Sequence, residues 1–282
     1  MGFKFRISLK YLVFFIVGVL AATTDAPEKI VSVATTVLPI HSLKDWINAT
    51  ILLSLGYGFK FLGIGYLLET LNPTPKNEYR VKQMKRQIKY GLQSLVVVIV
   101  STTIWLWKGD IQMPYYGYYE DHPYTFAEFL KNLAIYMFVF DSWFYWTHRL
   151  MHVPWFWKRI HYLHHQFTEP TAFAQDAVHP IEALIQGPIG HFLPTLFYPM
   201  HPVAISVFGF LTSTYALLAH DSRGLDLNDH VKHHHYHKCN FGLYWAVWDY
   251  ICDTRYSLKK FPVRYIPSWE REAAAAAKNK QS

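Results

Sequence analysis

The chain has 282 residues, of which 51% are apolar and 18% aromatic, whereas only 17% are charged. Soluble proteins carry about 25% charged residues, so this composition argues against a soluble domain and favours a membrane protein. The formal net charge is +7. Because no helix-turn-helix, zinc-finger or RNA-binding motif accompanies this charge, we expect no nucleic-acid partner.

The first 26 residues predict a targeting segment. Lys4, Arg6 and Lys10 precede an apolar run at 11–22, and small and polar residues follow that run. This order is typical of a signal peptide or of a signal anchor, and the two alternatives stay open. Both place the residues that follow on the lumenal side.

Three further apolar segments, at 47–71, 91–107 and 126–146, predict membrane-spanning helices. A basic block at 76–89 separates the first two, and the positive-inside rule assigns it to the cytosol. An acidic, tyrosine-rich stretch at 109–121 fits the lumenal interface. The first of these segments holds several glycines, which predict either close helix packing or a kinked helix.

Two more apolar segments, at 181–200 and 202–219, are interrupted by prolines. They predict either a spanning hairpin, which would return to the cytosolic side, or segments that lie partly in the membrane. We therefore expect an all-α fold: a polytopic membrane helical bundle of about four spans with a cytosolic helical cap. The expected regions are a signal peptide or anchor (1–26), an N-terminal transmembrane region (27–125), a catalytic domain (126–257) and a cytosolic tail (258–282).

Histidine is concentrated in one part of the chain, since all sixteen except His41 and His122 lie between His148 and His237. Three motifs contain eight of them: His148 and His152; His161, His164 and His165; His230, His233 and His234. Residues three and four apart share one face of a helix, so each motif can direct its imidazoles to one point. Eight converging imidazoles exceed the four-ligand shell of a structural zinc ion and predict two metal ions. Without metal, many buried ring nitrogens would lack partners.

The identity of the metal is less constrained by the residues. A nitrogen-rich ligand set for two metals against a membrane favours redox-active iron. Four acidic residues, however, could supply a general base near the metal: Asp141, Glu169, Asp176 and Glu182. A zinc-dependent membrane hydrolase and a catalytically silent metal-binding relative therefore stay open as alternatives.

The three motifs, H-x-x-x-H, H-x-x-H-H and a later H-x-x-H-H, resemble those of the fatty acid hydroxylase and sterol desaturase superfamily of endoplasmic-reticulum membrane enzymes. The flanking residues at 141–149, 157–161 and 240–249 resemble that superfamily as well. The segment from Pro170 to Glu182 is most similar to the sterol C5-desaturase (lathosterol oxidase) branch. The resemblance covers roughly residues 80–257.

The resemblance implies a centre of two iron ions that activates O2 with electrons from NAD(P)H, delivered by cytochrome b5 and its reductase; zinc could replace iron in a purified sample. The eight motif histidines would be the ligands, and His179 and His220 are further candidate ligands by family position. The substrate would be a membrane lipid or sterol. Desaturation would give an alkene, whereas the alternative, a fatty acid, sphingolipid or sterol hydroxylase, would give an alcohol. Lys278 and Lys280 resemble a dilysine retrieval signal of the endoplasmic reticulum, which acts from the cytosolic side.

Asp141 is a candidate for orienting a metal ligand. It lies seven residues before His148, two helical turns back on the same face, where a carboxylate could accept a hydrogen bond from a ligand ring. The alternative is an ion pair with Arg149 or Arg159. Asp176 and Asp249 are weaker candidates for the same orienting role, and we expect His235 and His237 to lie outside the ligand set.

Overall fold

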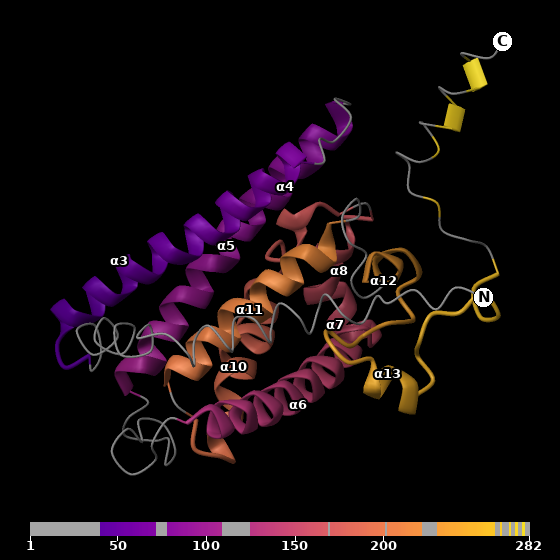
Figure 1. Ribbon diagram of the computed structural model, residues 1–282. Coiled ribbons are helices and arrows are strands. Elements are labelled where there is room, and N and C mark those ends of the chain that lie inside the picture. The colour runs from indigo at the N-terminus through magenta and orange to yellow at the C-terminus, as the bar shows by residue number, and fades with distance from the viewer. Residues whose placement is uncertain are drawn as a thin grey trace.

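The computed structural model describes residues 40–71, 78–108, 125–168, 170–200, 202–221 and 230–262, together with a few positions of the C-terminal tail. Throughout these residues every regular element is a helix (Figure 1), as the expected all-α class requires. The predicted targeting segment at 1–26, the acidic stretch at 109–121 and Lys280 of the predicted dilysine signal lie outside the described residues.

The N-terminal part of the described chain is one long rod. It consists of α3 (Leu43–Phe59), a π-helical turn η1 (Lys60–Ile64) and α4 (Gly65–Leu71). A capping box starts the rod, because the Ser42 hydroxyl accepts the Asp45 N–H and the Asp45 carboxylate accepts the Ser42 N–H.

The second long helix, α5 (Glu78–Lys108), runs antiparallel to the rod. Trp46 near the start of α3 stacks on Trp107 near the end of α5, and the hydroxyl of Thr50 lies 3.2 Å from that of Thr103. Figure 1 shows the two helices side by side along one flank of the molecule.

These two elements, Leu43–Leu71 and Glu78–Trp107, are long and apolar enough to cross a membrane. In the most apolar stretch of the first element only 17% of the residues are buried inside the protein, and in that of the second only 28% are. A soluble protein buries the apolar surface of its core helices, whereas lipid-facing helices leave it exposed. The chain is therefore an integral membrane protein. The next apolar helix, Val207–His220, is shorter, so the count of about four spans stays a prediction.

Of the glycines in the rod, Gly65 packs closely against another element, whereas Gly56 and Gly58 do not. A Cβ atom at Gly65 would lie 2.2 Å from the ring of Phe173, so only glycine allows α4 to approach that ring. A Cβ atom at Gly56 or Gly58 would meet nothing within 4 Å. Close packing thus depends on Gly65 in this rod.

A central aromatic core joins α6 (Phe126–Met151), capped by Thr125, to α11 (Pro202–His220). Its buried members include Tyr136 and Phe140 from α6 and Phe208 from α11, with the rings of Tyr136 and Phe208 5.2 Å apart. Because α6 ends at Met151, this core fixes the position of the first histidine motif.

Between α6 and α11 the chain forms short helical pieces instead of a second long apolar helix. Pro188 and a non-helical Gly187 break the segment that begins with α9, as the prolines predicted. The pieces are α7 (Pro154–Phe156), η3 (Trp157–His161), α8 (Tyr162–His165), η4 (Ala172–Ala174), α9 (Pro180–Leu184), η5 (Ile185–Ile189), α10 (Gly190–Phe192) and η6 (Leu193–Leu196).

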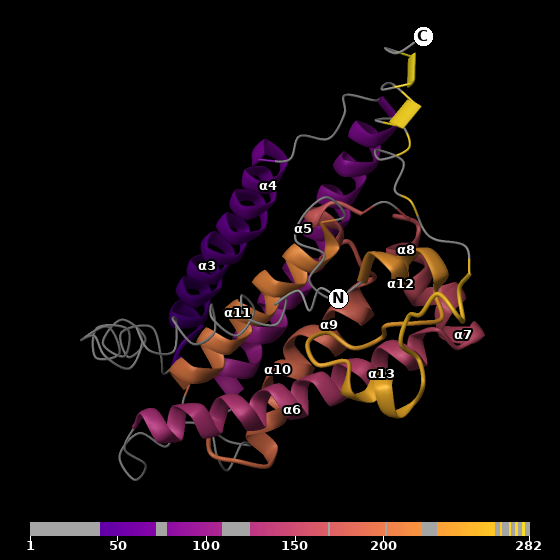
Figure 2. The same ribbon diagram turned by 45° about the vertical axis from the view of Figure 1, so that its right-hand side comes forward.

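After α11, the chain adds α12 (His230–Tyr236) and α13 (Val247–Ile251). Figures 1 and 2 show α7, α8, α12 and α13 gathered around the C-terminal end of α6. This cap carries all three histidine motifs. The basic start of α5 reaches it, since the Arg86 guanidinium donates to the Gln166 side chain at 2.7 Å.

Candidate metal centre

Nine histidines place their ring nitrogens in two groups. The first cluster is His148, His152, His161, His165 and His233, and the second cluster is His164, His220, His230 and His234. Within each cluster, one ring nitrogen per residue lies within 4.8 Å of all the others. All eight motif histidines are included, together with the candidate His220.

Helical phase explains how the motifs are divided. Residues four apart share a cluster, as do His161 and His165 in the first and His230 and His234 in the second. The adjacent pairs point to opposite clusters: His164 and His165 are separated, and so are His233 and His234. The second and third motifs therefore bridge the two clusters.

The ring nitrogens lie at the spacing expected of ligands around one ion. In the first cluster, His165 Nε2 is 3.0 Å from His161 Nε2 and 3.1 Å from His233 Nε2. In the second, His220 Nε2 is 3.3 Å from His164 Nε2. Metal–nitrogen bonds of about 2.0–2.1 Å put adjacent ligand atoms about 3.0–3.4 Å apart. Lone pairs at these distances repel unless a cation or proton lies between them.

Hydrogen bonds on the far side of the rings fix which nitrogen faces inward. A carbonyl oxygen can only accept, so a ring that bonds to one through Nδ1 carries its proton there and presents the lone pair of Nε2. Three rings donate in this way: His148 to Phe241 O at 2.8 Å, His233 to Cys239 O at 2.7 Å and His220 to Ala216 O at 2.7 Å.

Glu182 gives the fourth such contact. His161 Nδ1 donates to Glu182 Oε1 at 2.8 Å, and both side chains are only 1% exposed. From the sequence, Glu182 was predicted only as one of four acidic residues that could act as a general base. Its role beside a ligand was missed because no local spacing connects residues 21 positions apart.

Burial makes the rings neutral, which is the form that binds metal. It lowers the pKa of His148 and of His220 to about 4, although their hydrogen bonds to backbone carbonyls act in the opposite direction. Burial and then repulsion from neighbouring rings hold the pKa of His234 well below its usual value.

The donor set fits metal ions. Neither ring nitrogen of His234 has a hydrogen-bond partner within the described residues, and the same holds for Nε2 of His152. Leaving such buried groups unsatisfied is costly, and a cation at each cluster would satisfy one nitrogen of each ring. Borderline imidazole donors suit iron, zinc or copper.

Asp141 does not occupy its predicted place beside a ring. Its Oδ1 accepts the backbone N–H groups of Tyr244 at 2.8 Å and Leu243 at 3.2 Å, and Arg149 donates to the Tyr145 hydroxyl instead of pairing with it. The reason is distance, because seven helical residues separate Asp141 from His148 by about 10 Å along the axis.

Asp249 binds the same backbone segment, residues 241–244, that Asp141 binds. Its carboxylate accepts the N–H groups of Phe241 at 2.9 Å and Gly242 at 2.7 Å. Because the carbonyls of Phe241 and Cys239 bind His148 and His233, both aspartates support the first cluster through backbone atoms rather than through the rings.

The other candidates lie outside the two clusters. His179 caps α9, where its Nδ1 accepts the Ile181 N–H at 3.2 Å. Asp176 bonds to the Gln175 side chain and not to an imidazole. The ring of His237 packs 4.7 Å from that of His165, and His235 is exposed. Glu169 lies outside the described residues.

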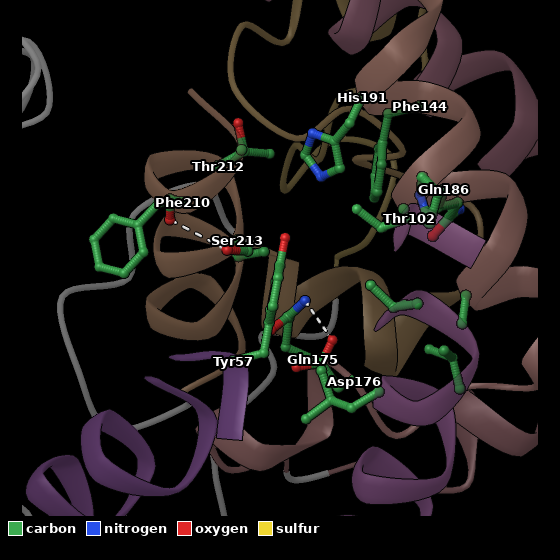
Figure 3. Close-up of a pocket in the computed structure, with 18 of the residues that line it drawn as sticks. Tyr57, Thr102, Phe144, Gln175, Asp176, Gln186, His191, Phe210, Thr212 and Ser213 are labelled. Atoms are coloured by element: carbon green, nitrogen blue, oxygen red, sulfur yellow. Dashed lines mark hydrogen bonds between the residues drawn. The ribbon is translucent and has the colours of Figure 1, made fainter. Parts of the chain in front are cut away.

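A largely apolar cavity of about 390 Å³ lies against the histidines. Three rings of the second cluster (His164, His220 and His230) line it, and so does His148 of the first cluster. Much of the remaining wall comes from α3, α5, α6, α11 and the η5 region, and Figure 3 shows part of the cavity with Phe144, Phe210 and several polar side chains labelled. A cavity of this size suits a small apolar ligand.

Comparison with known proteins agrees with this picture. Residues 133–254 match the fatty acid hydroxylase family, and that stretch contains both clusters. Lathosterol oxidase of Homo sapiens is 28% identical over 193 residues, which cover 62% of this chain and 62% of that protein. A Delta(7)-sterol 5(6)-desaturase of Leptosphaeria maculans is 28% identical over 202 residues, covering 68% and 56%. A C-4 methylsterol oxidase of Schizosaccharomyces pombe is 24% identical over 189 residues, covering 61% and 63%.

These matches confirm the resemblance expected from the motifs, since residues 133–254 match the fatty acid hydroxylase family. Within that class, the relatives named lathosterol oxidase and Delta(7)-sterol 5(6)-desaturase agree with the C5-desaturase branch. The matched region spans less than two thirds of the length of these relatives. No solved structure matches the chain.

Proposed function

We propose that this protein is a membrane-bound, iron- and O2-dependent oxidoreductase that desaturates a sterol in the manner of a C5-desaturase. The observation that carries the proposal is the pair of histidine clusters at the wall of an apolar cavity. Two adjacent nitrogen-rich clusters suit redox-active metal ions that reduce O2. The names of the relatives supply the substrate class.

We assign one iron ion to each cluster, with His220 joining the eight motif histidines as a ligand. Bound iron would supply the oxidising power of O2 towards an unactivated C–H bond. Overall, the sterol loses two hydrogens and O2 takes up these, two electrons and two protons to give an alkene and two waters. We expect the two electrons to come from NAD(P)H through cytochrome b5 and its reductase.

The protein's own groups would hold the ligands and exclude water. The carbonyls of Cys239, Phe241 and Ala216 and the carboxylate of Glu182 keep the Nδ1 protons in place, so that each Nε2 stays available. The apolar wall of the cavity would orient the sterol and keep bulk water from the reacting carbons.

We also propose that the cap faces the cytosol of an endoplasmic-reticulum membrane, in a bundle of about four spans. The contact between Arg86, in the basic start of α5, and Gln166, next to the second motif, supports this orientation. Basic residues at the end of a span favour the cytosolic side, and the cap contacts that end.

The test is reconstitution of the purified full chain with cytochrome b5, its reductase, NADH and lathosterol. We expect two iron ions per chain and O2-dependent formation of the 5,6-alkene. Zinc at both clusters in active protein, or no change in the sterol despite a full iron load, would contradict the proposal. An alcohol product would instead indicate the hydroxylase alternative.

A further inference from the structure

Polar side chains gather at one end of the largely apolar cavity. Lys60 comes from the π-helical turn η1, whereas Gln175 and Asp176 follow η4. Figure 3 shows Tyr57, Gln175 and Asp176 together at this end, with the Tyr57 hydroxyl directed into the open space. We call Lys60, Gln175 and Asp176 the polar pocket.

Two acceptors in the polar pocket are unsatisfied within the part of the chain that the structure describes. Gln175 Nε2 donates to Asp176 Oδ1 at 2.9 Å, which leaves Gln175 Oε1 and Asp176 Oδ2 without a hydrogen-bond partner among these residues. Asp176 is only 9% exposed, so water does not readily replace the missing partner. A buried acceptor without a partner costs about 1–3 kcal/mol. The arrangement therefore suits a ligand that brings a donor.

A cation completes the polar pocket. Lys60 is 4% exposed, and its Nζ lies 5.2 Å from the centre of the Tyr57 ring. Burial raises the pKa of Asp176, and attraction by Lys60 acts in the opposite direction. Within a candidate membrane-spanning rod, a buried lysine is expensive and marks a functional position. The π-helical turn is the local feature that places it there, as such turns often do at functional sites.

The polar pocket lies close to the second cluster. Gln175 and Asp176 line the same cavity as the ring of His164. The same cavity is lined by His164, His220 and His230. A molecule whose polar group sits in this pocket would have its neighbouring carbons beside the second cluster.

We propose that Lys60, Gln175 and Asp176 bind the ring hydroxyl of a sterol substrate, an inference that rests on the proposed function. A hydroxyl can donate to Asp176 Oδ2 or Gln175 Oε1 and accept from the Lys60 ammonium. It therefore satisfies both the acceptors and the cationic donor of the polar pocket. The middle of a fatty acyl chain brings no such group.

The chemistry of sterols agrees with this placement. The hydroxyl is on C3, and the names of the relatives give reactions at C5–C6 and at C4, within a few bonds of it. An enzyme of this kind therefore needs its hydroxyl-binding groups next to the metal rather than at the far end of the cavity.

The experiment compares binding of radiolabelled lathosterol with binding of its 3-deoxy analogue to the purified, metal-loaded full chain. We expect the alcohol to bind about 10- to 100-fold more tightly, because hydrogen bonds to charged groups contribute on this scale. Asp176→Leu and Lys60→Met should each remove most of this preference, and Asp176→Asn should remove part of it. Thr103→Val, which deletes a buried hydroxyl outside the cavity, is the matched control and should keep it.

Equal binding of the two probes by the unaltered protein would overturn the inference, as would a full preference in Asp176→Leu that retains its metal. If Asp176→Leu loses metal or fails to fold, the unaltered protein and Lys60→Met decide the question. A preference for the alcohol without turnover would support the polar pocket and contradict the proposed function. Turnover of lathosterol without any preference would do the reverse.

Discussion

The two histidine clusters are built from the same motifs, yet they differ in how they are held and in what they face. In the first cluster, three rings donate hydrogen bonds from Nδ1: His148 and His233 to carbonyls and His161 to Glu182. In the second, His220 donates to a carbonyl, whereas neither nitrogen of His234 has a partner among the described residues.

The two clusters also differ in how many of their rings line the cavity. It is lined by three of the four rings of the second cluster and by one ring of the first. Among the described residues, the first cluster thus has three rings held through Nδ1 and one ring at the cavity, whereas the second has three rings at the cavity and His220 held through Nδ1. We infer that the first cluster mainly retains its metal, whereas the second also meets the substrate. Each prediction below tests this division.

The largest effects should follow from removing one ligand of each cluster. His161→Ala and His164→Ala should each lower turnover by more than about 100-fold. Removing a residue that only hydrogen-bonds to a metal ligand already lowers metal affinity or activity by about 10- to 100-fold, and loss of the ligand itself should cost more. Each should lose the iron of its own cluster. Sterol binding should weaken only in His164→Ala, since His164 lines the cavity. Iron content and lathosterol binding are the measurements, and full activity in either variant would refute the assignment.

A smaller effect is expected when the support of the first cluster is removed. Glu182→Ala deletes the acceptor for His161 Nδ1 and should weaken iron binding by about 10- to 100-fold. Glu182→Gln keeps an acceptor oxygen and should lose much less. Iron retained during titration with a chelator measures both. If the two variants lose iron equally, the contribution of Glu182 is its charge rather than its hydrogen bond.

The sequence predicts the chemistry of the cap better than its supports. Motif spacing and helical phase predict that the eight histidines can converge, and the apolar segment at 126–146 predicts the helix that carries the first motif. Contacts between distant segments leave no local pattern, so Glu182 was not connected to His161. Family position could not separate His220, which the structure places in a cluster, from His179, which caps a helix. The rod shows the same limit, because its glycines look alike until Phe173 is placed against one of them.

Acid should destabilise the protein once its metal has been stripped. The pKa of His148 and of His220 is about 4 in the folded protein, below the ordinary value of 6.5. Between these values the unfolded chain binds more protons, so stability is complete above about pH 6.5 and falls as the pH approaches 4. At pH 5 each ring would cost about 2 kcal/mol if it titrated alone.

The measurement is the Tm of chelator-treated protein between pH 7 and pH 5. His220→Gln should flatten the dependence, whereas His41→Gln, at an exposed position, should leave it unchanged. Iron-loaded protein should resist the same change until the metal dissociates, because bound metal competes with protons for Nε2. A Tm of the stripped protein that does not fall in acid would argue against neutral, buried rings.

The smallest effect concerns the contact between the membrane rod and the second cluster. In Gly65→Ala, the added methyl group would lie 2.2 Å from the Phe173 ring. That ring packs edge-on against Phe61 and Tyr66 and has little room to move. Overpacking of this kind costs about 1–3 kcal/mol, so Tm should fall. Gly58→Ala is the matched control, because its methyl group meets nothing and alanine favours helix by about 1 kcal/mol.

Measuring which cluster of Gly65→Ala releases its iron first would test the difference between the two clusters. Phe173 belongs to η4, and Gln175 and Asp176, which follow it, line the same cavity as His164. Strain at Phe173 should therefore reach the second cluster, while Glu182 and the carbonyls at Cys239 and Phe241 hold the first in place. We expect Gly65→Ala to release the iron of the second cluster at a lower chelator concentration than that of the first. Equal release from both clusters would mean that the two are held as one unit.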